Sequence, residues 1–301
     1  MAPSLDRLSG LLQRQRMRAT LLHTGPLCGV THFAGDLGHG YLHVLRRGET
    51  TITHRPRSGA PKVVKLTEPA LVFYPRPLEH AFHNAPQEGS DFTCATVAFD
   101  GGAQHPLAKA LPAMMVVPLN KAPSMDMALT LLFAETDQVQ CGHQLLADKL
   151  FEVVMLQLLR WLLNHVDETG IQPGLFHGLA HPRLSKALVA LHDAPGEPWS
   201  LERLAEVAGM SRSAFAATFK DVMGDTPADY LTDWRLSLAQ AALRDGQAVK
   251  TIANELGYAT ASALSRVFAQ RLGCSPREWL AHMTHAAHTA HTAHTAPSQA
   301  T

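Results

Sequence analysis

The sequence predicts an α+β chain of two domains, with a β-rich domain before an all-α domain. Three observations predict this architecture: short apolar runs bounded by turn residues over 20–120, apolar residues at helical spacing from 124 onward, and a duplicated helical unit after 181. The 301 residues are enough for two domains with a sizeable core in each.

The first part of the chain is predicted to fold as a β-barrel or a β-sandwich. Apolar runs of four to seven residues recur there, and Gly, Pro and Asn separate them at close intervals. This spacing is typical of short strands joined by turns. The predicted strands are Tyr41–Leu45, Thr50–Thr53, Val63–Leu66, Ala70–Tyr74 and Thr93–Phe99.

A long helix is predicted over 145–163, where helix breakers are few and apolar residues cover almost the whole circumference. Such a helix has to bury two faces. Either both faces pack within its own domain, or one of them forms a homodimer interface. Residues 166–180, which hold three Gly and one Pro, are predicted to link the two domains.

Composition excludes several classes of protein. Apolar residues make up 46% of the chain and charged residues 17%, as in a folded globular protein. We expect a cytoplasmic protein, because the sequence has no apolar run of transmembrane length and no signal peptide. The four cysteines form no C-x-x-C pair, which argues against a zinc ribbon or a disulfide framework. The formal net charge is zero, so composition gives no indication of a nucleic-acid partner.

The C-terminal tail has histidine at every third position from His282 to His294. Such a repeat could bind a divalent metal weakly, but a tract of His, Thr and Ala is more typical of a disordered segment. We therefore predict a disordered tail over 284–301.

An internal repeat predicts the function. The segments Leu204–Ser211 and Ile252–Thr260 place an alanine, a glycine turn and then Ser or Thr at matching positions. The offset is 48 residues before the turn and 49 after it, and the second offset continues through matching Phe, Gly, Pro and aromatic positions. One residue inserted in a turn explains the change, so a single unit occurs twice.

The spacing that the two units share predicts a helix-turn-helix in each. Gly209 and Gly257 end a first helix in a conformation that costs other residues energy. Ser211 and Thr260 then cap a second helix, which is the one that enters the major groove of DNA. Apolar positions at i and i+4 of that helix face the core and leave the opposite side for DNA, and these are Phe215, Phe219, Leu264 and Phe268.

The spacing of the units and their charge bear on how they would bind DNA. A long helix over Pro227–Arg244 would hold the two reading helices apart, and about one turn of B-DNA, roughly 34 Å, would place them in successive major grooves. Residues 181–283 contain eleven Lys and Arg and eleven Asp and Glu. Binding to DNA therefore depends on charge being sorted by face.

The segment 181–280 resembles the AraC/XylS family of bacterial regulators. The resemblance rests on the second unit, Ile252–Trp279, and on the Gly-x-Thr-Pro and Gly-x-Ser-Pro sequences that follow the two units. It departs from the family at Leu280, where many members have Arg. The resemblance implies a transcription regulator of double-stranded promoter DNA rather than an enzyme. A homodimer formed through the 145–163 helix would suit paired binding sites, and RNA polymerase is the expected partner if the chain is an activator.

Carried over by position, the resemblance assigns DNA contacts to both reading helices. Arg266 is the strongest candidate for a base contact because Arg pairs bidentately with guanine, although a phosphate contact or a surface salt bridge is the alternative. Lys220, Arg212 and Arg271 are better suited to neutralise phosphates. The small Ala216 and Ala217 can at most touch thymine methyl groups. The candidate contacts are Arg212, Ser213, Ala216, Ala217, Lys220, Ala261, Ser262, Ser265 and Arg266.

Residues 5–120 are similar to the cupin-type β-barrel that often precedes the DNA-binding domain in this family. Gly38–Glu49 resembles the first cupin motif and Leu66–His80 the second. Metal-binding cupins need a His-x-His pair, a Glu and a further His, and here His43 and His80 fit, with His39 as a weaker candidate. Two imidazoles hold a divalent ion poorly, so no cofactor is predicted. The alternatives are a weak metal site, polar residues of a ligand pocket, or buried barrel histidines.

The resemblance to regulators with a cupin-type domain implies a small molecule or an oxidant as the effector. His43 and His80 are the candidates for an effector pocket, and Cys28 and Cys94 are the candidates for oxidation. A thiol senses oxidants only when it is exposed and readily ionised. The alternative is that Cys94 is a small buried apolar residue on a strand.

These observations predict four segments in the chain. A cupin-like sensor and dimerisation domain covers 1–165, a linker covers 166–180, a double helix-turn-helix DNA-binding domain covers 181–283, and the tail follows. The competing hypothesis is a metal-dependent cupin enzyme with a helical appendage. A third hypothesis, an interaction module that does not bind DNA, is favoured only by the neutral charge.

Overall fold

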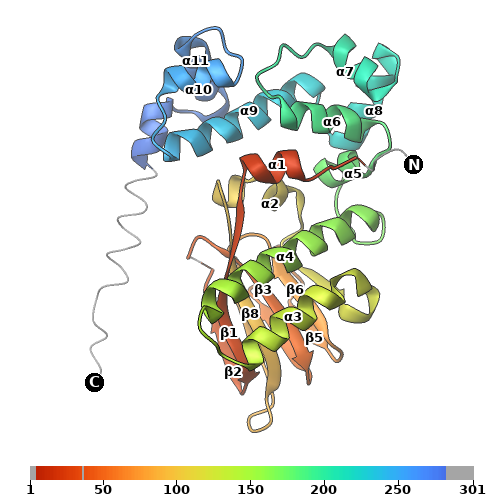
Figure 1. The fold of residues 1–301 in the computed structure, drawn as a ribbon, viewed down its shortest axis with the longest axis vertical. Helices are drawn as coiled ribbons and strands as arrows, with labels where there is room; N and C mark the ends of the chain where they lie inside the picture. Colours follow the sequence, from red (N-terminus) through yellow and green to blue (C-terminus); the bar gives the residue numbers. More distant parts are fainter. Residues whose placement is uncertain (1–4, 36, 283–301) are drawn as a thin grey trace.

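The computed structural model describes residues 5–35 and 37–282, and it confirms the two-domain α+β fold (Figure 1). The predicted tail at 284–301 lies outside the described residues. A β-rich domain with flanking helices comes first, and a helical domain covers one end of it. In the described part of the chain, no helix combines the length and apolar content needed to cross a bilayer.

Two antiparallel sheets form the first domain. The five-stranded sheet has the order β1-β8-β3-β6-β9, and the four-stranded sheet has the order β2-β7-β4-β5. All five strands predicted from the sequence are present, two of them with the predicted bounds. The strands are β1 (Met17–Leu27), β2 (Val30–Phe33), β3 (Gly40–Arg47), β4 (Thr50–His54), β5 (Val63–Leu66), β6 (Ala70–Tyr74), β7 (His80–His83), β8 (Ser90–Phe99) and β9 (Met115–Pro118).

The central strands of the larger sheet are buried on both faces. In β3, Leu42 and Val44 point toward the helices that cover the sheet, whereas Tyr41 and Leu45 belong to the core between the two sheets. This alternation explains the nearly continuous apolar sequence of β3 and β6, because a strand covered on both faces has no solvent side.

The remaining elements of the chain are helices. Short 3₁₀ turns occur at Gly102–Gln104, Leu119–Lys121 and Pro123–Met125. Residues 276–282 are also helical. The α-helices are α1 (Ser9–Arg14), α2 (Pro106–Ala110), α3 (Asp126–Asp137), α4 (His143–Asn164), α5 (Leu175–Ala180), α6 (Leu184–Asp193), α7 (Leu201–Ala208), α8 (Arg212–Met223), α9 (Pro227–Arg244), α10 (Val249–Glu255) and α11 (Ala261–Leu272).

Helices α3 and α4 pack together and lie over one face of the larger sheet (Figure 1). The long helix predicted over 145–163 is α4. One face of it packs on β1, where Asp148 accepts a hydrogen bond of 2.7 Å from the backbone N–H of Leu21. Its other face is not fully covered, since Leu145 is 68% exposed, Leu146 48% and Val153 44%.

The two domains are joined through α1 and α5. The segment predicted as a linker contains α5, whose side chains Leu175, Phe176 and Leu179 are buried against neighbouring helices. From the N-terminal segment, Arg14 donates to the backbone oxygen of Asp193 at 2.6 Å, and the Gln15 amide donates to the Ser237 hydroxyl at 2.7 Å.

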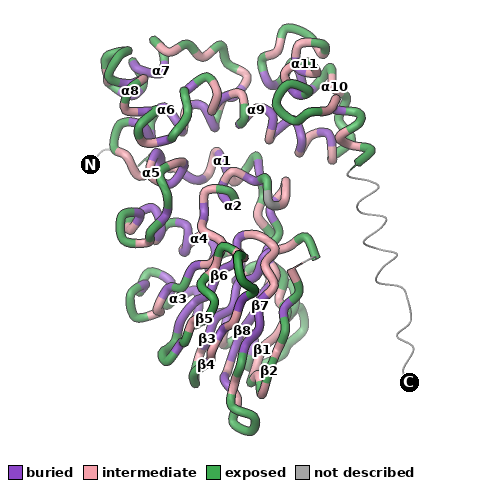
Figure 2. The backbone as a smooth tube through the Cα atoms, turned by 180° about the vertical axis from the view of Figure 1, so that it is seen from behind, coloured by how far each residue is buried: buried purple, intermediate pink, exposed green. Residues whose placement is uncertain are grey.

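Besides the core between the two sheets, a larger cluster of buried apolar residues continues from the helix-covered face of the larger sheet through α4 and α5 into the helical domain (Figure 2). Through the hydrogen bonds of Arg14 and Gln15, the first domain contacts α6 and α9.

Candidate nucleic-acid interface and N-terminal domain

The duplicated unit folds as two helix pairs, α7 with α8 and α10 with α11. Gly209 ends α7 with a φ of 64°, and Gly257 follows α10 with a φ of 74°, as the turns require. The Ser211 hydroxyl accepts a hydrogen bond from the N–H of Ala214 at 3.3 Å, and Thr260 caps α11 in the same way through Ala263 at 3.1 Å. Both predicted N-caps are confirmed.

The second helix of each pair has a buried face and an exposed face. The four apolar residues predicted to face the core have at most 1% of their surface exposed: Phe215, Phe219, Leu264 and Phe268. Their rings and branched side chains hold α8 and α11 against the body of the domain. The opposite side of each helix therefore carries the candidate DNA contacts.

On α8, the candidate contacts are exposed to different extents. Arg212, Ser213, Ala217 and Lys220 are exposed, whereas Ala216 is half-buried. The Arg212 guanidinium forms an ion pair of 3.0 Å with Glu202 of α7, although both side chains remain largely exposed. Part of the cationic charge of the first unit is thereby offset.

On α11, the candidate contacts form a continuous patch. Ser262 and Arg266 are exposed, and Ala261 and Ser265 are half-buried beside them. Within residues 5–35 and 37–282, the Arg266 side chain has no hydrogen-bond or ion-pair partner. Its charge is therefore available to a ligand.

Arg271, expected to neutralise a phosphate, is instead held by acidic residues. It forms ion pairs with Asp229 and, at 3.9 Å, with Asp233, both on α9. Hydrogen bonds that Thr226 and Arg271 donate to the Asp229 carboxylate lower the pKa of Asp229. Since its guanidinium is already paired, Arg271 is a weaker candidate for DNA than Arg266.

Comparison with known proteins identifies two families in this chain. A Cupin family model matches residues 6–164, and a Helix-turn-helix domain model matches residues 204–282. The first match alone covers more than half of the chain, and the second covers both duplicated units. The chain belongs to the AraC family of transcription regulators. Its N-terminal part is a cupin domain and its C-terminal part is a helix-turn-helix domain.

The chain is similar to individual transcription regulators over different shares of its length. A putative AraC-like transcription regulator of Streptomyces lividans is 35% identical over 190 residues, a match that covers 62% of each chain and therefore less than two thirds of the relative. The RCS-specific HTH-type transcriptional activator RclR of Escherichia coli is 26% identical over 282 residues, covering 91% of this chain and 97% of RclR. Among solved structures, the DNA-binding domain of AdpA bound to a target DNA is 28% identical, covering 34% of this chain and 93% of that domain with a TM-score of 0.33.

In the cupin domain of this AraC-family chain, the structure brings together His43 of β3 and His80 of β7. Their Nε2 atoms are 3.0 Å apart in the core between the sheets. The His80 Nδ1 lies 2.8 Å from the backbone oxygen of Leu78 and donates to it, so the His80 Nε2 accepts a hydrogen bond from His43. Burial lowers the pKa of His80 to about 4, and it lowers the pKa of His43 as well. Both imidazoles are therefore neutral at pH 7.

Sequence reasoning missed His54 and Tyr74, which extend this cluster. The His54 Nε2 lies 2.9 Å from the Tyr74 hydroxyl, and the Tyr74 ring stacks on His80 with centroids 4.0 Å apart. The alternation of burial along β4 could have identified His54, because it is the third inward-facing position after Thr50 and Ile52.

The residues present do not fit the metal site of a cupin. Within the described ranges, no group of three or more His, Cys, Asp or Glu side chains is arranged to hold a metal ion. His39 is half-buried at the start of the hairpin and packs edge-on against Tyr41. His43 and His80 alone supply two donors, and no carboxylate joins them.

The two cysteines considered as redox sensors differ in their exposure to solvent. Cys94 lies on β8 opposite His43 and is fully buried, which raises the pKa of its thiol above its usual range. Cys28 follows β1 and is exposed. The prediction that Cys94 is a buried apolar residue is confirmed, and only Cys28 of the pair is accessible to an oxidant in this conformation.

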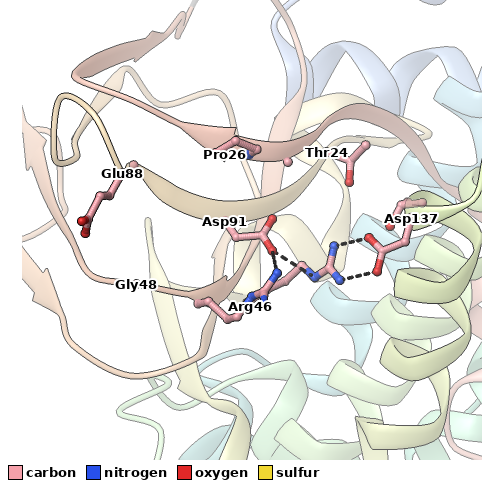
Figure 3. Close-up of a pocket in the computed structure, with 11 residues that line it drawn as sticks. Thr24, Pro26, Arg46, Gly48, Glu88, Asp91 and Asp137 are labelled. Carbon is pink, nitrogen blue, oxygen red and sulfur yellow. Dashed lines mark hydrogen bonds and ion pairs between the residues drawn. The ribbon is translucent and has the colours of Figure 1, made fainter.

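A cavity of about 500 Å³ lies where the sheet meets the end of α3 (Figure 3). Arg46 donates to both carboxylate oxygens of Asp137, at 2.6 and 2.7 Å, and lies 3.8 Å from Asp91. Its guanidinium also lies over the ring of Phe133. These contacts use most of the donors of Arg46, so the residue ties β3 and β8 to α3 rather than offering a free site.

A larger cavity of about 860 Å³ lies between the domains, lined by residues of α2, α9 and the C-terminal end of α11. Apolar side chains such as Leu236 and Trp279 alternate there with charged ones, including Lys109 and Asp233. Trp234 also lines it, and its indole Nε1 is buried without an acceptor among the described residues. The cavity combines apolar walls with polar groups, as small-molecule sites do.

Proposed function

We propose that this chain binds specific promoter sequences in the cytoplasm and regulates transcription, with both helix-turn-helix units on one DNA duplex. The observation that carries the proposal is the pair of capped helices, α8 and α11, which bury one face and present polar residues on the other. Helix α9, with 18 residues, connects the units and spans about 27 Å at 1.5 Å per residue. This length is comparable to one turn of B-DNA, about 34 Å.

Activation is the direction that we propose, with RNA polymerase as the partner. The support comes from RclR, which is named as an activator and which this chain matches over almost the whole length of both proteins.

Selection of bound fragments tests the DNA-binding function. Purified full-length protein is mixed with fragmented genomic DNA of its host, and the retained fragments are sequenced. We expect enrichment of a motif with two half-sites spaced by about 10 base pairs. Retention of fragments without any shared motif would contradict sequence-specific binding.

We propose that the cupin domain senses an oxidant through Cys28. The support is the exposure of Cys28, together with the name of RclR as RCS-specific. Oxidation of a thiol adds polarity beside the β1 end, where the Cys28 sulfur lies near Gly89. The alternative effector is a small molecule, and the cavity between the domains supports that alternative.

Mass spectrometry and DNA binding together test the oxidant proposal. We expect Cys28 to be oxidised first, and the Cys28→Ser variant to bind DNA identically with and without oxidant. The Cys94→Ser variant is the matched control and should keep the response. A response to oxidant that survives in Cys28→Ser would rule out Cys28 as the sensor and point to another thiol, such as the exposed Cys141.

A homodimer is the oligomeric state that we propose. The support is a set of exposed apolar side chains on α3 and α4, namely Met127, Leu131, Leu145, Leu146 and Val153. A second copy of the chain would cover this apolar face and bring a second pair of reading helices to the promoter.

A further inference from the structure

The duplicated unit builds the same surface groove twice. Groove 1 lies beside α8, and groove 2 lies beside α11. Leu201 of groove 1 corresponds to Val249 of groove 2 at the 48-residue offset of the first helices. Four further pairs correspond at the 49-residue offset, and these are Ala216 with Ser265, Thr226 with Ser275, Pro227 with Pro276 and Ala228 with Arg277.

The two grooves differ in chemistry although they share a backbone. Groove 1 is mainly apolar, with Trp199, Leu204 and Leu231 in its wall and Lys220 as its cation. Groove 2 has a volume of about 550 Å³ and is lined by two arginines and three serines, with no acidic residue among its lining side chains. The residues of groove 2 are Val249, Ala261, Ser262, Ser265, Arg266, Ser275, Pro276 and Arg277.

The cations of groove 2 are not neutralised by the protein. Arg266 and Arg277 are both exposed, and within the described ranges neither guanidinium forms a hydrogen bond or an ion pair. In contrast, Arg203 is paired with Glu197 and Arg212 with Glu202 in the first unit. The neighbouring acid Glu278 is also engaged, since it accepts a hydrogen bond of 2.8 Å from the N–H of Ser275 and caps the last helix.

We propose that groove 2 binds a backbone phosphate of the promoter, with Arg277 as the main contact. The proposal rests on the proposed DNA-binding function and adds a residue to it. Arg277 belongs to the helix over 276–282 and not to α11, so it lies at the edge of the reading surface. A cation at that edge meets the sugar-phosphate backbone when α11 enters the major groove.

The hydroxyl groups of groove 2 match the same ligand. Ser262 and Ser265 lie on α11 beside Arg266, and their O–H groups can donate to phosphate oxygens. The Ser275 oxygen accepts the N–H of Glu278 at 3.3 Å, which leaves its proton free to donate. The Arg277 guanidinium and the three hydroxyls, without a competing carboxylate in the lining, are suited to a phosphate and leave Arg266 for base recognition.

Salt-dependent binding of the full-length protein tests this assignment. The dissociation constant is measured between 50 and 300 mM salt for the Arg277→Ala variant on the selected promoter fragment and on an unrelated duplex, at about 25 °C. We expect binding to both duplexes to weaken by the same factor, about three- to tenfold, and the salt slope to fall by about one. The Arg277→Lys variant should keep the slope, because it keeps the charge.

Two variants serve as controls. Arg47→Ala removes an exposed cation of the cupin domain, 81% of whose side chain is accessible, and should leave both affinity and slope unchanged. Ala228→Arg places the missing cation in groove 1 and should increase the slope by about one.

Three outcomes would overturn the assignment while the protein still binds its promoter. They are an unchanged slope in Arg277→Ala, a loss confined to the promoter fragment, and an equal loss in Arg47→Ala. Failure of the unmodified protein to bind any duplex would instead contradict the proposed function itself. Unchanged circular dichroism of Arg277→Ala confirms that the variant is folded.

Discussion

At the scale of single residues, ion pairs within the protein decide which cationic side chains are available to bind DNA. Arg212 and Arg266 are both candidates from the sequence, but Arg212 is paired with Glu202 and Arg266 is unpaired in the described structure. Exposed ion pairs are weak, so DNA could displace Glu202 from Arg212. Breaking the Arg212–Glu202 ion pair still reduces the binding free energy that a contact from Arg212 to DNA would contribute. Arg266 therefore remains the strongest candidate for base recognition.

The Arg266→Ala variant is expected to lose about 1–3 kcal/mol of binding free energy on the promoter fragment and to tolerate base changes at one position. The physical reason is the loss of a bidentate hydrogen bond to guanine. Competition gel shifts with single-base variants of the fragment measure both effects. Unchanged binding and unchanged base preference would show that Arg266 does not read a base.

Buried histidines make stability depend on pH. Burial lowers the pKa of His192 to about 3 and the pKa of His80 and His105 to about 4, from an ordinary value of 6.5. The unfolded chain takes up protons below pH 6.5, whereas the folded chain does so only near the lowered values. Folding stability is therefore full above pH 6.5 and decreases as the pH falls toward 4.

Each buried histidine is expected to lower the free energy of unfolding by up to about 1.4 kcal/mol per pH unit between 6.5 and 4. Thermal unfolding of the full chain at pH 7.5 and at pH 5 measures the difference. In His192→Phe this difference should be smaller, and in the exposed control His32→Gln it should be unchanged. An equal difference in all three proteins would contradict the assignment to buried His192.

At the scale of elements, local sequence rules explain why the unit folds the same way twice. Glycine with positive φ ends the first helix, and a hydroxyl then caps the second. These interactions involve neighbours in sequence, so both units form them. The grooves beside α8 and α11 share a backbone for the same reason and differ only in side chains.

Two glycines with similar backbone angles separate conformational strain from steric overlap. Gly257 and Gly273 have φ values of 74° and 76°. A Cβ at Gly257 would overlap the backbone oxygen of Gly196, whereas a Cβ at Gly273 would meet no atom within 4 Å. We expect Gly273→Ala to lose about 1 kcal/mol of unfolding free energy and Gly257→Ala to lose at least 2 kcal/mol more, as measured by urea unfolding. Equal losses of unfolding free energy in the two variants would mean that the loop at Gly196 moves aside without an energetic cost.

At the scale of the whole molecule, the cupin domain is coupled to the DNA-binding domain through α9. This helix connects the two units, and Gln15 of the cupin domain contacts its Ser237. The larger of the two buried apolar clusters includes residues of both domains. If the cupin domain senses an effector as proposed, these contacts are the route by which it would alter how the units are presented.

The exposed face of α3 and α4 gives a prediction about assembly. Leu131→Glu combined with Leu145→Glu should convert a dimer into a monomer, because the charges would be buried at the interface. Light scattering at micromolar concentration measures the mass. The matched control is Val63→Glu on β5, since Val63 and Leu131 are both 55% exposed. A wild-type protein that is monomeric at these concentrations would contradict the dimer.

The sequence by itself determined the two-domain fold, the five predicted strands, the long helix and both helix-turn-helix units. These features follow from periodicity and from caps, which act between residues close together in the chain. The sequence also predicted that α11 is a reading helix, and it offered as one alternative that Cys94 is buried on a strand. It did not identify His54, Tyr74 or Arg277 as members of their sites.

Only the tertiary structure decided which side chains meet. His43 and His80 are 37 residues apart in sequence and share a hydrogen bond, and Arg271 is held by Asp229 across two helices. Arg266 and Arg277 come from different helices and line one groove. Whether a charge is neutralised, and whether an imidazole is buried, depends on packing between distant segments. Local patterns carry no information on such contacts, because many partners of the same residue type are equally compatible with them.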